Sequence, residues 1–221
     1  LRMVSIEPTF SRFKRTVRDL AGELGKEVKL DVVGGETELD KNVIESIADP
    51  LKHLIRNAVH HGLESPEARE AAGKPRTGTL RLAAEQREGS IFLEVGDDGG
   101  GINGEKVLAK AKKVGLVAED ANLSEAECHA LLFEAGFSTA DEVNEISGRG
   151  VGLDVVRKNI EQLRGDVSVL SKRGEGTTFR IRLPLTLAIV DGMTVRIGDE
   201  VLTVPLLSVI EQLRPEAKDL K

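Results

Sequence analysis

The segment DPLKHLIRNAVHHG carries an unusual set of polar side chains at helical spacing. On a helical wheel its apolar residues gather on one side, and the opposite side holds His53, Arg56, Asn57, His60 and His61. An ordinary solvated helix face would carry glutamate and lysine instead. The amide oxygen of Asn57 suits Mg²⁺, which takes one or two protein ligands together with phosphate oxygens. The segment therefore predicts either a phosphate-handling helix or a surface helix that happens to be rich in histidine.

Three histidines close together also allow a zinc site. Zinc sites in proteins usually add cysteine or carboxylate ligands to histidine. Cys128, the one cysteine of the chain, belongs to a different predicted helix, so the sequence disfavours zinc.

The sequence VGDDGGGI follows a predicted strand. Asp97 stands where that strand stops, and Gly99 and Gly101 permit close approach of the backbone to a neighbour. A carboxylate in such a place can accept a hydrogen bond from an exocyclic amine, as on adenine. The alternative interpretation is a turn capped by an aspartate.

Three glycines in SGRGVGLDVV, which are Gly148, Gly150 and Gly152, lead directly into a predicted helix. Backbone N–H groups and the helix dipole at such a place can bind phosphate. The spacing is not that of a dinucleotide-binding fingerprint, because Leu153 stands where a third glycine is needed. The sequence also lacks the P-loop and protein-kinase signatures. A further turn, GEGTTF, carries two threonines that can bond to polar ligand atoms or simply favour a strand.

These motifs need helices and strands to position them. Apolar residues at helical spacing predict helices over about 10–24, 39–47, 50–62, 104–113, 124–133 and 151–163. Alternating apolar residues predict strands over about 28–32, 79–86, 90–95, 166–171 and 177–183. The step Asp49-Pro50 is interpreted as a new helix start, and the stretches after residue 62 and from residue 134 to 149 as loops. The order indicates an α/β fold in which helices cover one face of a mixed sheet.

Composition limits the class of protein. Of the 221 residues, 40% are hydrophobic and 31% charged, as in globular proteins. The net charge of −6 and the absence of tryptophan and tyrosine argue against nucleic-acid binding. No apolar run reaches the ~18–20 residues needed to cross a bilayer. A single cysteine cannot form an internal disulfide, which favours a reducing compartment such as the cytoplasm.

The character of the sequence changes after Pro184. The stretch TLAIVDGMTVRIGDEVLTVPLLSVI is typical of a β-hairpin with its turn at Gly198 and Asp199. So short a segment cannot close a core by itself. We therefore expect one domain over 1–183 and, over 184–221, the truncated beginning of an all-β domain. The first residue, Leu1, fits an excised piece of a longer protein.

The order of the motifs is more specific than any one of them. An asparagine-bearing helix, Asp-x-Gly-x-Gly, a long loop into Gly-x-Gly-x-Gly and then Gly-x-Gly-Thr-Thr resembles the N, G1, G2 and G3 boxes of the GHKL superfamily. That superfamily includes gyrases, heat-shock chaperones, mismatch-repair proteins and histidine kinases. Within it the chain resembles the chemotaxis histidine kinases, through FSRFKRTVRDLAGELGK, ELDKNVIESIADPLKHLIRNAVHHGLE and GFSTADEVNEISGRGVGLDVVRKNI. The junction PLTLAIVDGMTVRIGDE resembles the start of a CheW-like regulatory domain.

The resemblance implies a Bergerat-type fold, a two-layer α/β sandwich that binds ATP and Mg²⁺. It implies that Asn57 holds the Mg²⁺ and that Asp97 binds the adenine amine. Gly99 and Gly101 would shape the wall of the adenine pocket, and Thr178 would support it.

At the phosphate end, the resemblance implies a catalytic position for His53 near the γ-phosphate, with Arg56 and His61 lining the site. Ser138 and the loop after it would form a lid over the nucleotide. That lid would extend to Arg149, and Gly148, Gly150 and Gly152 would cover the phosphates. The chain departs from the family at His60, where the family usually has aspartate.

Three functions are compatible with these residues. The first is a kinase domain that transfers the γ-phosphoryl group of ATP to a histidine on a separate phospho-acceptor domain, in cis or in trans. The second is an ATP-driven clamp of the gyrase or chaperone kind; such proteins carry glutamate one helical turn before the asparagine, where this chain has His53, which favours transfer over hydrolysis. The third is a nucleotide-binding scaffold without catalysis, which His60 keeps open. The resemblance further implies a homodimeric whole protein with a CheW-like adaptor and chemoreceptors as partners.

Overall fold

The structure, a computed structural model, describes four stretches of the chain: residues 2–137, 152–185, 192–198 and 200–205. The chain divides into two compact units, Leu1–Leu185 and Thr186–Lys221, which are described separately. None of the described helices is long and apolar enough to span a bilayer.

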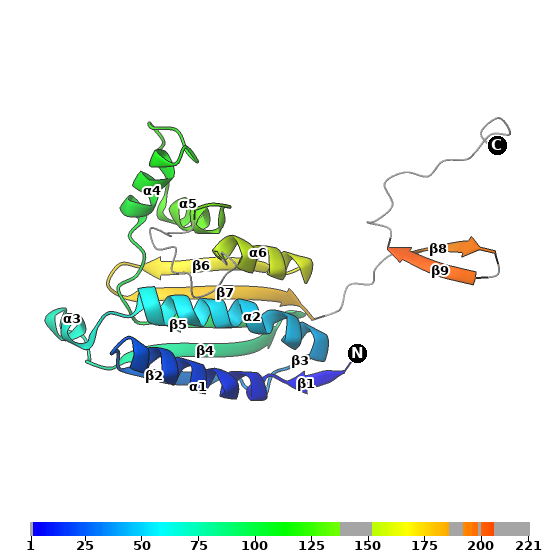
Figure 1. The fold of residues 1–221 in the computed structure, drawn as a ribbon, viewed down its shortest axis with the longest axis horizontal. Helices are drawn as coiled ribbons and strands as arrows, with labels where there is room; N and C mark the ends of the chain where they lie inside the picture. The colour runs from blue at the N-terminus through cyan, green and yellow to red at the C-terminus, as the bar shows by residue number, and fades with distance from the viewer. Residues whose placement is uncertain (1, 138–151, 186–191, 199, 206–221) are drawn as a thin grey trace. The chain divides into compact units, whose positions relative to one another are not determined.

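A five-stranded mixed sheet forms the centre of the first unit (Figure 1). In spatial order its strands are β2 (Val28–Val33), β4 (Gly78–Arg87), β5 (Ser90–Asp97), β7 (Gly176–Pro184) and β6 (Asp166–Lys172). β2 runs parallel to β4, and the other neighbouring strands are antiparallel. All five predicted strands are therefore present, and the mixed character of the sheet is confirmed.

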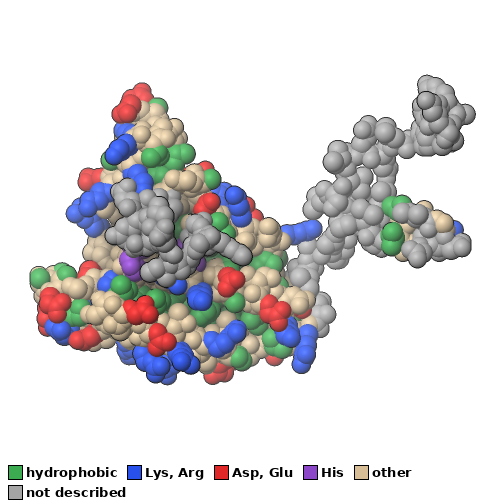
Figure 2. All heavy atoms as spheres, in the orientation of Figure 1, with side chains coloured by type: hydrophobic (Ala, Val, Ile, Leu, Met, Phe, Trp, Pro, Cys, Tyr) green, Lys and Arg blue, Asp and Glu red, His purple; other side chains and the backbone are tan. Residues whose placement is uncertain are grey.

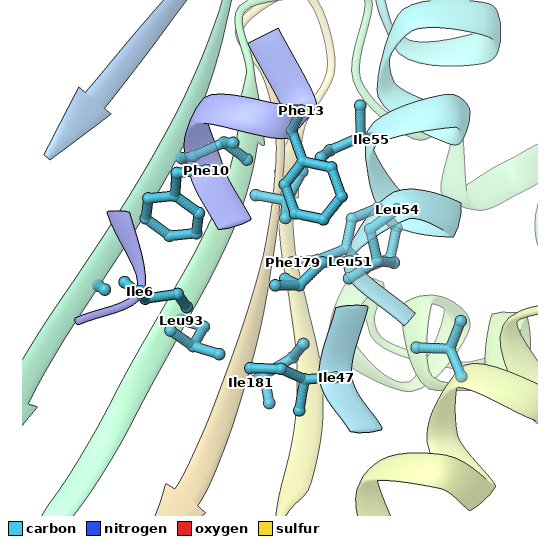
Figure 3. Packing of buried hydrophobic residues seen from close by; sticks show 14 of the residues in the cluster. Ile6, Phe10, Phe13, Ile47, Leu51, Leu54, Ile55, Leu93, Phe179 and Ile181 are labelled. Carbon is cyan, nitrogen blue, oxygen red and sulfur yellow. The ribbon is translucent and has the colours of Figure 1, made fainter. Parts of the chain in front are cut away.

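Three helices, α1 (Glu7–Glu23), α2 (Lys41–Asn57) and α6 (Leu153–Gln162), lie on one face of this sheet (Figure 1). Their apolar residues, three and four positions apart, meet the apolar residues that alternate along the strands. Figure 3 shows the centre of this core, formed by Ile6, Phe10, Phe13, Ile47, Leu51, Leu54, Ile55, Leu93, Phe179 and Ile181. The predicted arrangement of one helical layer on one sheet is confirmed.

The opposite face of the sheet carries charged side chains. Arg81 and Glu85 of β4 are exposed there, and Arg180 of β7 forms an ion pair with Glu94 of β5, with 2.7 Å between Nε and Oε1. Residues on this face alternate along each strand with the buried residues of the core. Two residues that follow each other in a strand of this sheet therefore lie on opposite faces, one toward the core and one toward the charged face.

Helix α2 differs from the prediction. The expected helix over 39–47 and the new start at Pro50 are wrong, because α2 is continuous through the proline. Its N-cap is Asp40, whose carboxylate accepts a hydrogen bond from the Asn42 N–H (2.9 Å). Pro50 has no N–H to donate to the Ser46 carbonyl. The helix nevertheless continues, because apolar residues on both sides of the proline are buried at helical spacing.

Short elements lie where the sequence predicted none. Helix α3 (Pro66–Ala71) occupies part of the expected loop, with Ser65 at its N-cap accepting a hydrogen bond from the Ala68 N–H (3.3 Å). The Ser-Pro step was a signal for this helix, since proline favours the first helical position. At the N-terminal end, β1 (Met3–Ser5) pairs antiparallel with β3 (Glu38–Asp40).

The segment after β5 forms the two helical stretches that the sequence predicts, shorter in the second case. They are α4 (Gly104–Lys113), α5 (Glu125–Ala130) and a following 3-10 turn, η2 (Leu131–Phe133). In the second unit, the described residues form an antiparallel hairpin of β8 (Gly192–Ile197) and β9 (Glu200–Pro205). Gly198 in its turn has a φ of +62°.

Candidate nucleotide-binding site

The polar face of α2 leads into a π-helical turn. Asn57 is the last residue of α2, and η1 (Ala58–Gly62) continues the chain. The Leu63 N–H donates to the carbonyl of Ala58, five residues earlier (2.8 Å). π-helical turns are rare and occur frequently at functional sites. The predicted helix end at residue 62 is therefore correct, but its last turn is wider than an α-helix.

The helical wheel correctly divided this segment. The apolar residues are buried, whereas His53 and Asn57 are half-buried and Arg56, His60 and His61 are exposed. The Nδ1 atoms of His60 and His61 lie 3.4 Å apart. In Figure 2 histidine side chains (purple) are visible in small areas beside the undescribed residues, which are drawn in grey.

Lys26 forms hydrogen bonds with backbone carbonyls in and just after η1. Its Nζ donates hydrogen bonds to the carbonyls of Val59 (2.8 Å), His60 (2.8 Å) and Leu63 (2.7 Å). Carbonyls at the C-terminal end of a helix lack partners within the helix, and a cation there also interacts favourably with the helix dipole. Burial lowers the pKa of Lys26, while the nearby Glu64 acts in the opposite direction. Sequence reasoning missed this lysine, because its partners are more than thirty residues away.

Asp97 ends strand β5 against the end of η1. Its Oδ1 accepts a hydrogen bond from the Gly99 N–H (2.9 Å), and the Thr177 N–H is a second donor to the carboxylate. A Cβ at position 62 would lie 2.6 Å from Asp97 Oδ2. A Cβ at position 99 would overlap the carbonyl of Gly62. Both positions therefore require glycine, and the carboxylate sits in a cradle made of backbone.

The environment of Asp97 changes its acidity. The pKa of Asp97 is raised from 3.8 to about 6, mainly by burial and also by the charges of Asp98 and Glu64. The hydrogen bonds from Gly99 and Thr177 lower it. Two donors leave acceptor capacity on a carboxylate, which can take up to about four hydrogen bonds. A half-buried carboxylate with a perturbed pKa and remaining acceptor capacity is typical of a binding site for a donor group such as an amine.

Two glycines allow the turns beside Asp97 to pack closely against each other. Gly101 has a φ of +70° and Gly176 a φ of +117°. A Cβ at Gly101 would overlap the Lys172 carbonyl, and a Cβ at Gly176 would overlap the carbonyl of Asp97. The turn after β5 and the turn before β7 are therefore packed directly against each other.

The register of β5 and β7 changes the expectation for Thr178. Thr178 pairs with Gly96, and a Cβ there would lie 3.0 Å from the Thr178 Oγ1, on the face opposite to Asp97. Thr177 pairs with Asp97, is buried, and lies 3.0 Å from the Ser171 hydroxyl. Thr177, rather than Thr178, therefore lies on the same face of the sheet as Asp97. The residue types could not separate the two, because neighbouring strand residues differ only in the face they occupy.

The start of α6 lies near the half-buried His53. Gly152 is the N-cap of α6, and its carbonyl accepts the Val155 N–H (3.2 Å). Burial lowers the pKa of His53, the charge of Arg56 lowers it further, and Asp154 in the first turn of α6 acts in the opposite direction. Asp154 is a neighbour that sequence reasoning did not single out. Four expected site residues lie outside the described part of the chain: Ser138, Gly148, Arg149 and Gly150.

The oxygen atoms of this site fit a metal ion that is held mainly by the phosphates of a bound molecule. Across the described residues, no group of three or more histidine, cysteine, aspartate or glutamate side chains could hold a metal ion. Asn57 offers one neutral oxygen on the half-buried end of α2. That set suits Mg²⁺, which usually keeps waters and binds through one or two protein oxygens and phosphates.

A family comparison adds to this geometry. Residues 46–187 match the family described as "Histidine kinase-, DNA gyrase B-, and HSP90-like ATPase". The match includes Asn57, Asp97 and the GEGTTF turn. The chain belongs to this ATPase family. Membership implies that this chain uses ATP, and the resemblance to GHKL proteins is confirmed.

Relatives within this ATPase family are chemotaxis proteins. Over all of its length the chain is 54% identical to the chemotaxis protein CheA of Salmonella typhimurium and 46% identical to that of Bacillus subtilis. The chain spans 33% of the length of each of these relatives. The expected resemblance to chemotaxis histidine kinases is therefore confirmed over the chain.

Solved structures of histidine kinases share the fold. The mycobacterial sensor histidine kinase MprB matches with a TM-score of 0.52 and 18% identity, over 85% of this chain and all of that one. Full-length ShkA, solved in complex with AMPPNP, matches with a TM-score of 0.54 and 21% identity, over 85% of this chain and 32% of that one. The predicted two-layer α/β fold is confirmed.

Proposed function

We propose that this chain is the ATP-binding catalytic domain of a chemotaxis histidine kinase, which transfers the γ-phosphoryl group of Mg-ATP to a histidine on a separate phospho-acceptor domain. The observation that carries the proposal is the half-buried carboxylate of Asp97 in its backbone cradle, in a chain about half identical to CheA proteins. ATP supplies the phosphoryl group, and Mg²⁺ neutralises charge on its phosphates.

In this proposal Asp97 distinguishes adenine from guanine. Its carboxylate accepts a hydrogen bond from the exocyclic amine of adenine, whereas guanine would present a carbonyl to it and be repelled. Gly62 and Gly99 support this role, because any side chain there would meet the carboxylate or its cradle. Gly101 and Thr177 form the neighbouring wall.

The C-terminal part of α2 and the following turn η1 bind the phosphates in this proposal. The Asn57 amide oxygen holds Mg²⁺, and Arg56 and His61 contribute to binding of the negatively charged phosphates. His53 has a lowered pKa, which favours the neutral imidazole at pH 7. A neutral imidazole can accept the proton that the attacking histidine loses, or donate a hydrogen bond that orients the γ-phosphate. Gly152 at the N-terminus of α6 adds a helix dipole to this end.

The remaining assignments concern parts of the protein beyond the described site. We assign Ser138, Gly148, Arg149 and Gly150 to a segment that covers the nucleotide. The phospho-acceptor domain acts in cis or in trans, and the whole protein is a homodimer in the cytoplasm. Residues 184–221 begin a CheW-like β domain, through which a CheW-like adaptor and chemoreceptors bind.

A phosphotransfer assay tests the proposal. The chain is incubated with Mg²⁺, γ-labelled ATP and a separate phospho-acceptor domain of a chemotaxis histidine kinase. We expect acid-labile phosphohistidine on the acceptor, lost in Asp97→Asn and retained in Asp166→Asn, a change at an exposed carboxylate of β6. Release of free phosphate without phosphohistidine would instead indicate the clamp ATPase. Binding of ATP with neither product would indicate a scaffold.

A further inference from the structure

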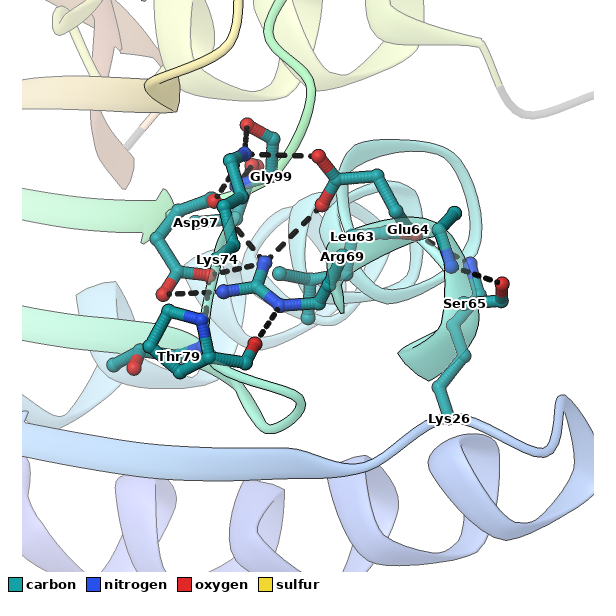
Figure 4. Close-up of polar contacts among 12 residues, drawn as sticks. Lys26, Leu63, Glu64, Ser65, Arg69, Lys74, Thr79, Asp97 and Gly99 are labelled. Atoms are coloured by element: carbon teal, nitrogen blue, oxygen red, sulfur yellow. Dashed lines mark hydrogen bonds and ion pairs between the residues drawn. The ribbon is translucent and has the colours of Figure 1, made fainter. Parts of the chain in front are cut away.

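Four charged side chains connect α3 and its neighbouring loops to the turn that follows Asp97 (Figure 4). This Arg69 cluster consists of Glu64, Arg69, Lys74 and Asp98. It contains two cations and two carboxylates, and none of the expected site residues belongs to it. Its place directly behind the base-reading carboxylate suggests a role in recognition.

Arg69 is the buried centre of the cluster. Only 1% of its side chain is exposed. Its guanidinium donates to Glu64 Oε2 (3.1 Å), to Asp98 Oδ2 (3.1 Å), to the Asp98 carbonyl (3.2 Å) and to the Pro75 carbonyl (2.7 Å). A buried guanidinium is stable only when its donors are paired in this way. Asp98 is thereby held at both its side chain and its backbone.

Lys74 holds the same turn from a second side. Its Nζ donates to Glu64 Oε1 (2.8 Å), to the Asp98 carbonyl (3.0 Å) and to the Gly99 carbonyl (2.7 Å). The N–H of Gly99 is one of the two donors to the Asp97 carboxylate. The cations therefore hold the peptide group that contains the Gly99 N–H, through the Asp98 carbonyl, and the following peptide group, through the Gly99 carbonyl.

We propose that Arg69 and Lys74 are positioning residues for base recognition, which hold the Asp98–Gly99 turn so that the Asp97 carboxylate presents its acceptor to adenine. This inference rests on the proposed role of Asp97. Neither cation bonds to Asp97 or is assigned a contact with the nucleotide. Both act through the backbone of the turn and through charge.

The charges of the Arg69 cluster predict the direction in which the pKa of Asp97 should move when one of them is removed. Four charged groups surround Asp97: Asp98 beside it on the chain, Glu64 after η1, Arg69 on α3 and Lys74 on the loop before β4. The two carboxylates raise the pKa of Asp97. Loss of the Lys74 charge should raise that pKa, and loss of the Glu64 charge should lower it. A change that only loosens the fold would not produce opposite signs.

Calorimetry of the chain with ATP and with GTP, between pH 5 and pH 8, tests the inference. Lys74→Met should reduce the ratio of ATP affinity to GTP affinity about fivefold, because energetic coupling between contacting residues is of this size. It should also move the acidic loss of ATP binding upward by about half a pH unit, whereas Glu64→Gln should move it downward by a similar amount. Lys74→Arg keeps the charge and should retain both properties.

The matched control is Arg76→Met. Arg76 lies on the same loop and pairs with Glu27, Glu67 and Glu70, but with no group of the turn. It should leave the ATP preference and the pH profile as in the parent chain. Asp97→Asn sets the reference, since its pH profile no longer contains the titration of Asp97. Adding Lys74→Met to Asp97→Asn should reduce the preference for ATP over GTP no further.

The outcomes separate the two proposals. If Asp97→Asn keeps the parent preference for ATP, adenine is read elsewhere, and the proposed role of Asp97 fails together with the inference. If Asp97→Asn loses the preference while Lys74→Met and Glu64→Gln leave preference and pH profile unchanged, the inference alone is overturned. If Lys74→Met does not fold, Glu64→Gln decides: a downward shift supports the inference, and no shift or an upward shift overturns it.

Discussion

Replacing Asp97 with asparagine should make the nucleotide-free chain relatively more stable as the pH rises. Burial raises the pKa of Asp97 to about 6 from its ordinary 3.8. At 1.36 kcal/mol per pH unit, this difference corresponds to roughly 3 kcal/mol between the two protonation states. Because the folded pKa is the higher one, the parent chain has this stability in full below about pH 3.8 and loses it as the pH rises through about 6. Asparagine does not titrate, so the Asp97→Asn variant does not lose this stability as the pH rises.

Urea unfolding of parent and Asp97→Asn measures this difference. From pH 4.5 to pH 7.5, the stability of the variant relative to the parent should rise by about 2 kcal/mol, since most of the titration falls in that interval. The comparison across pH matters more than either value alone, because the asparagine amide meets the Thr177 N–H and loses a roughly constant 1–3 kcal/mol. Asp166→Asn, at an exposed carboxylate, reports the general effect of removing one negative charge. A stability difference that is the same at both pH values would refute the account of a desolvated carboxylate.

Three further changes test other parts of the site. Asn57→Ala should remove most of the Mg²⁺-dependent part of ATP affinity, about tenfold; calorimetry with and without chelator measures it, and an unchanged metal dependence would speak against the ligand role. His53→Gln should leave ATP affinity nearly unchanged while phosphotransfer falls about 10²-fold; equal losses of both would make His53 a binding residue only. Lys26→Met should lower the free energy of unfolding by about 1–2 kcal/mol, because three carbonyls at the end of η1 lose their donor. The exposed Lys29→Met serves as its control in urea unfolding, and equal stability of the two variants would show that the Lys26 bonds contribute nothing.

Much of the fold could be predicted from periodicity. Strands and helices with one buried face carry a regular apolar pattern, and all five strands of the main sheet were found in this way. The error at Pro50 has a physical reason: a proline inside a helix costs one hydrogen bond, but burial of Ile47, Leu51 and Leu54 outweighs that loss. Helix α3 was missed because it is short and its pattern is brief.

The site was predictable where residue type and local spacing define the chemistry. The polar face with Asn57 and the carboxylate at the end of β5 both follow from local sequence. Strand register decided between Thr177 and Thr178, and register depends on pairing between distant strands. Arg69 and Lys26 act through partners far along the chain, so no local pattern indicates them.

A crystal structure of the chain with Mg²⁺ and a non-hydrolysable ATP analogue tests the central claim most directly. The account predicts the adenine amine within hydrogen-bonding distance of the Asp97 carboxylate, the base against the wall formed by Gly101 and Thr177, and the metal on the Asn57 amide oxygen. Adenine bound away from Asp97, with its amine facing solvent or another side chain, would contradict it.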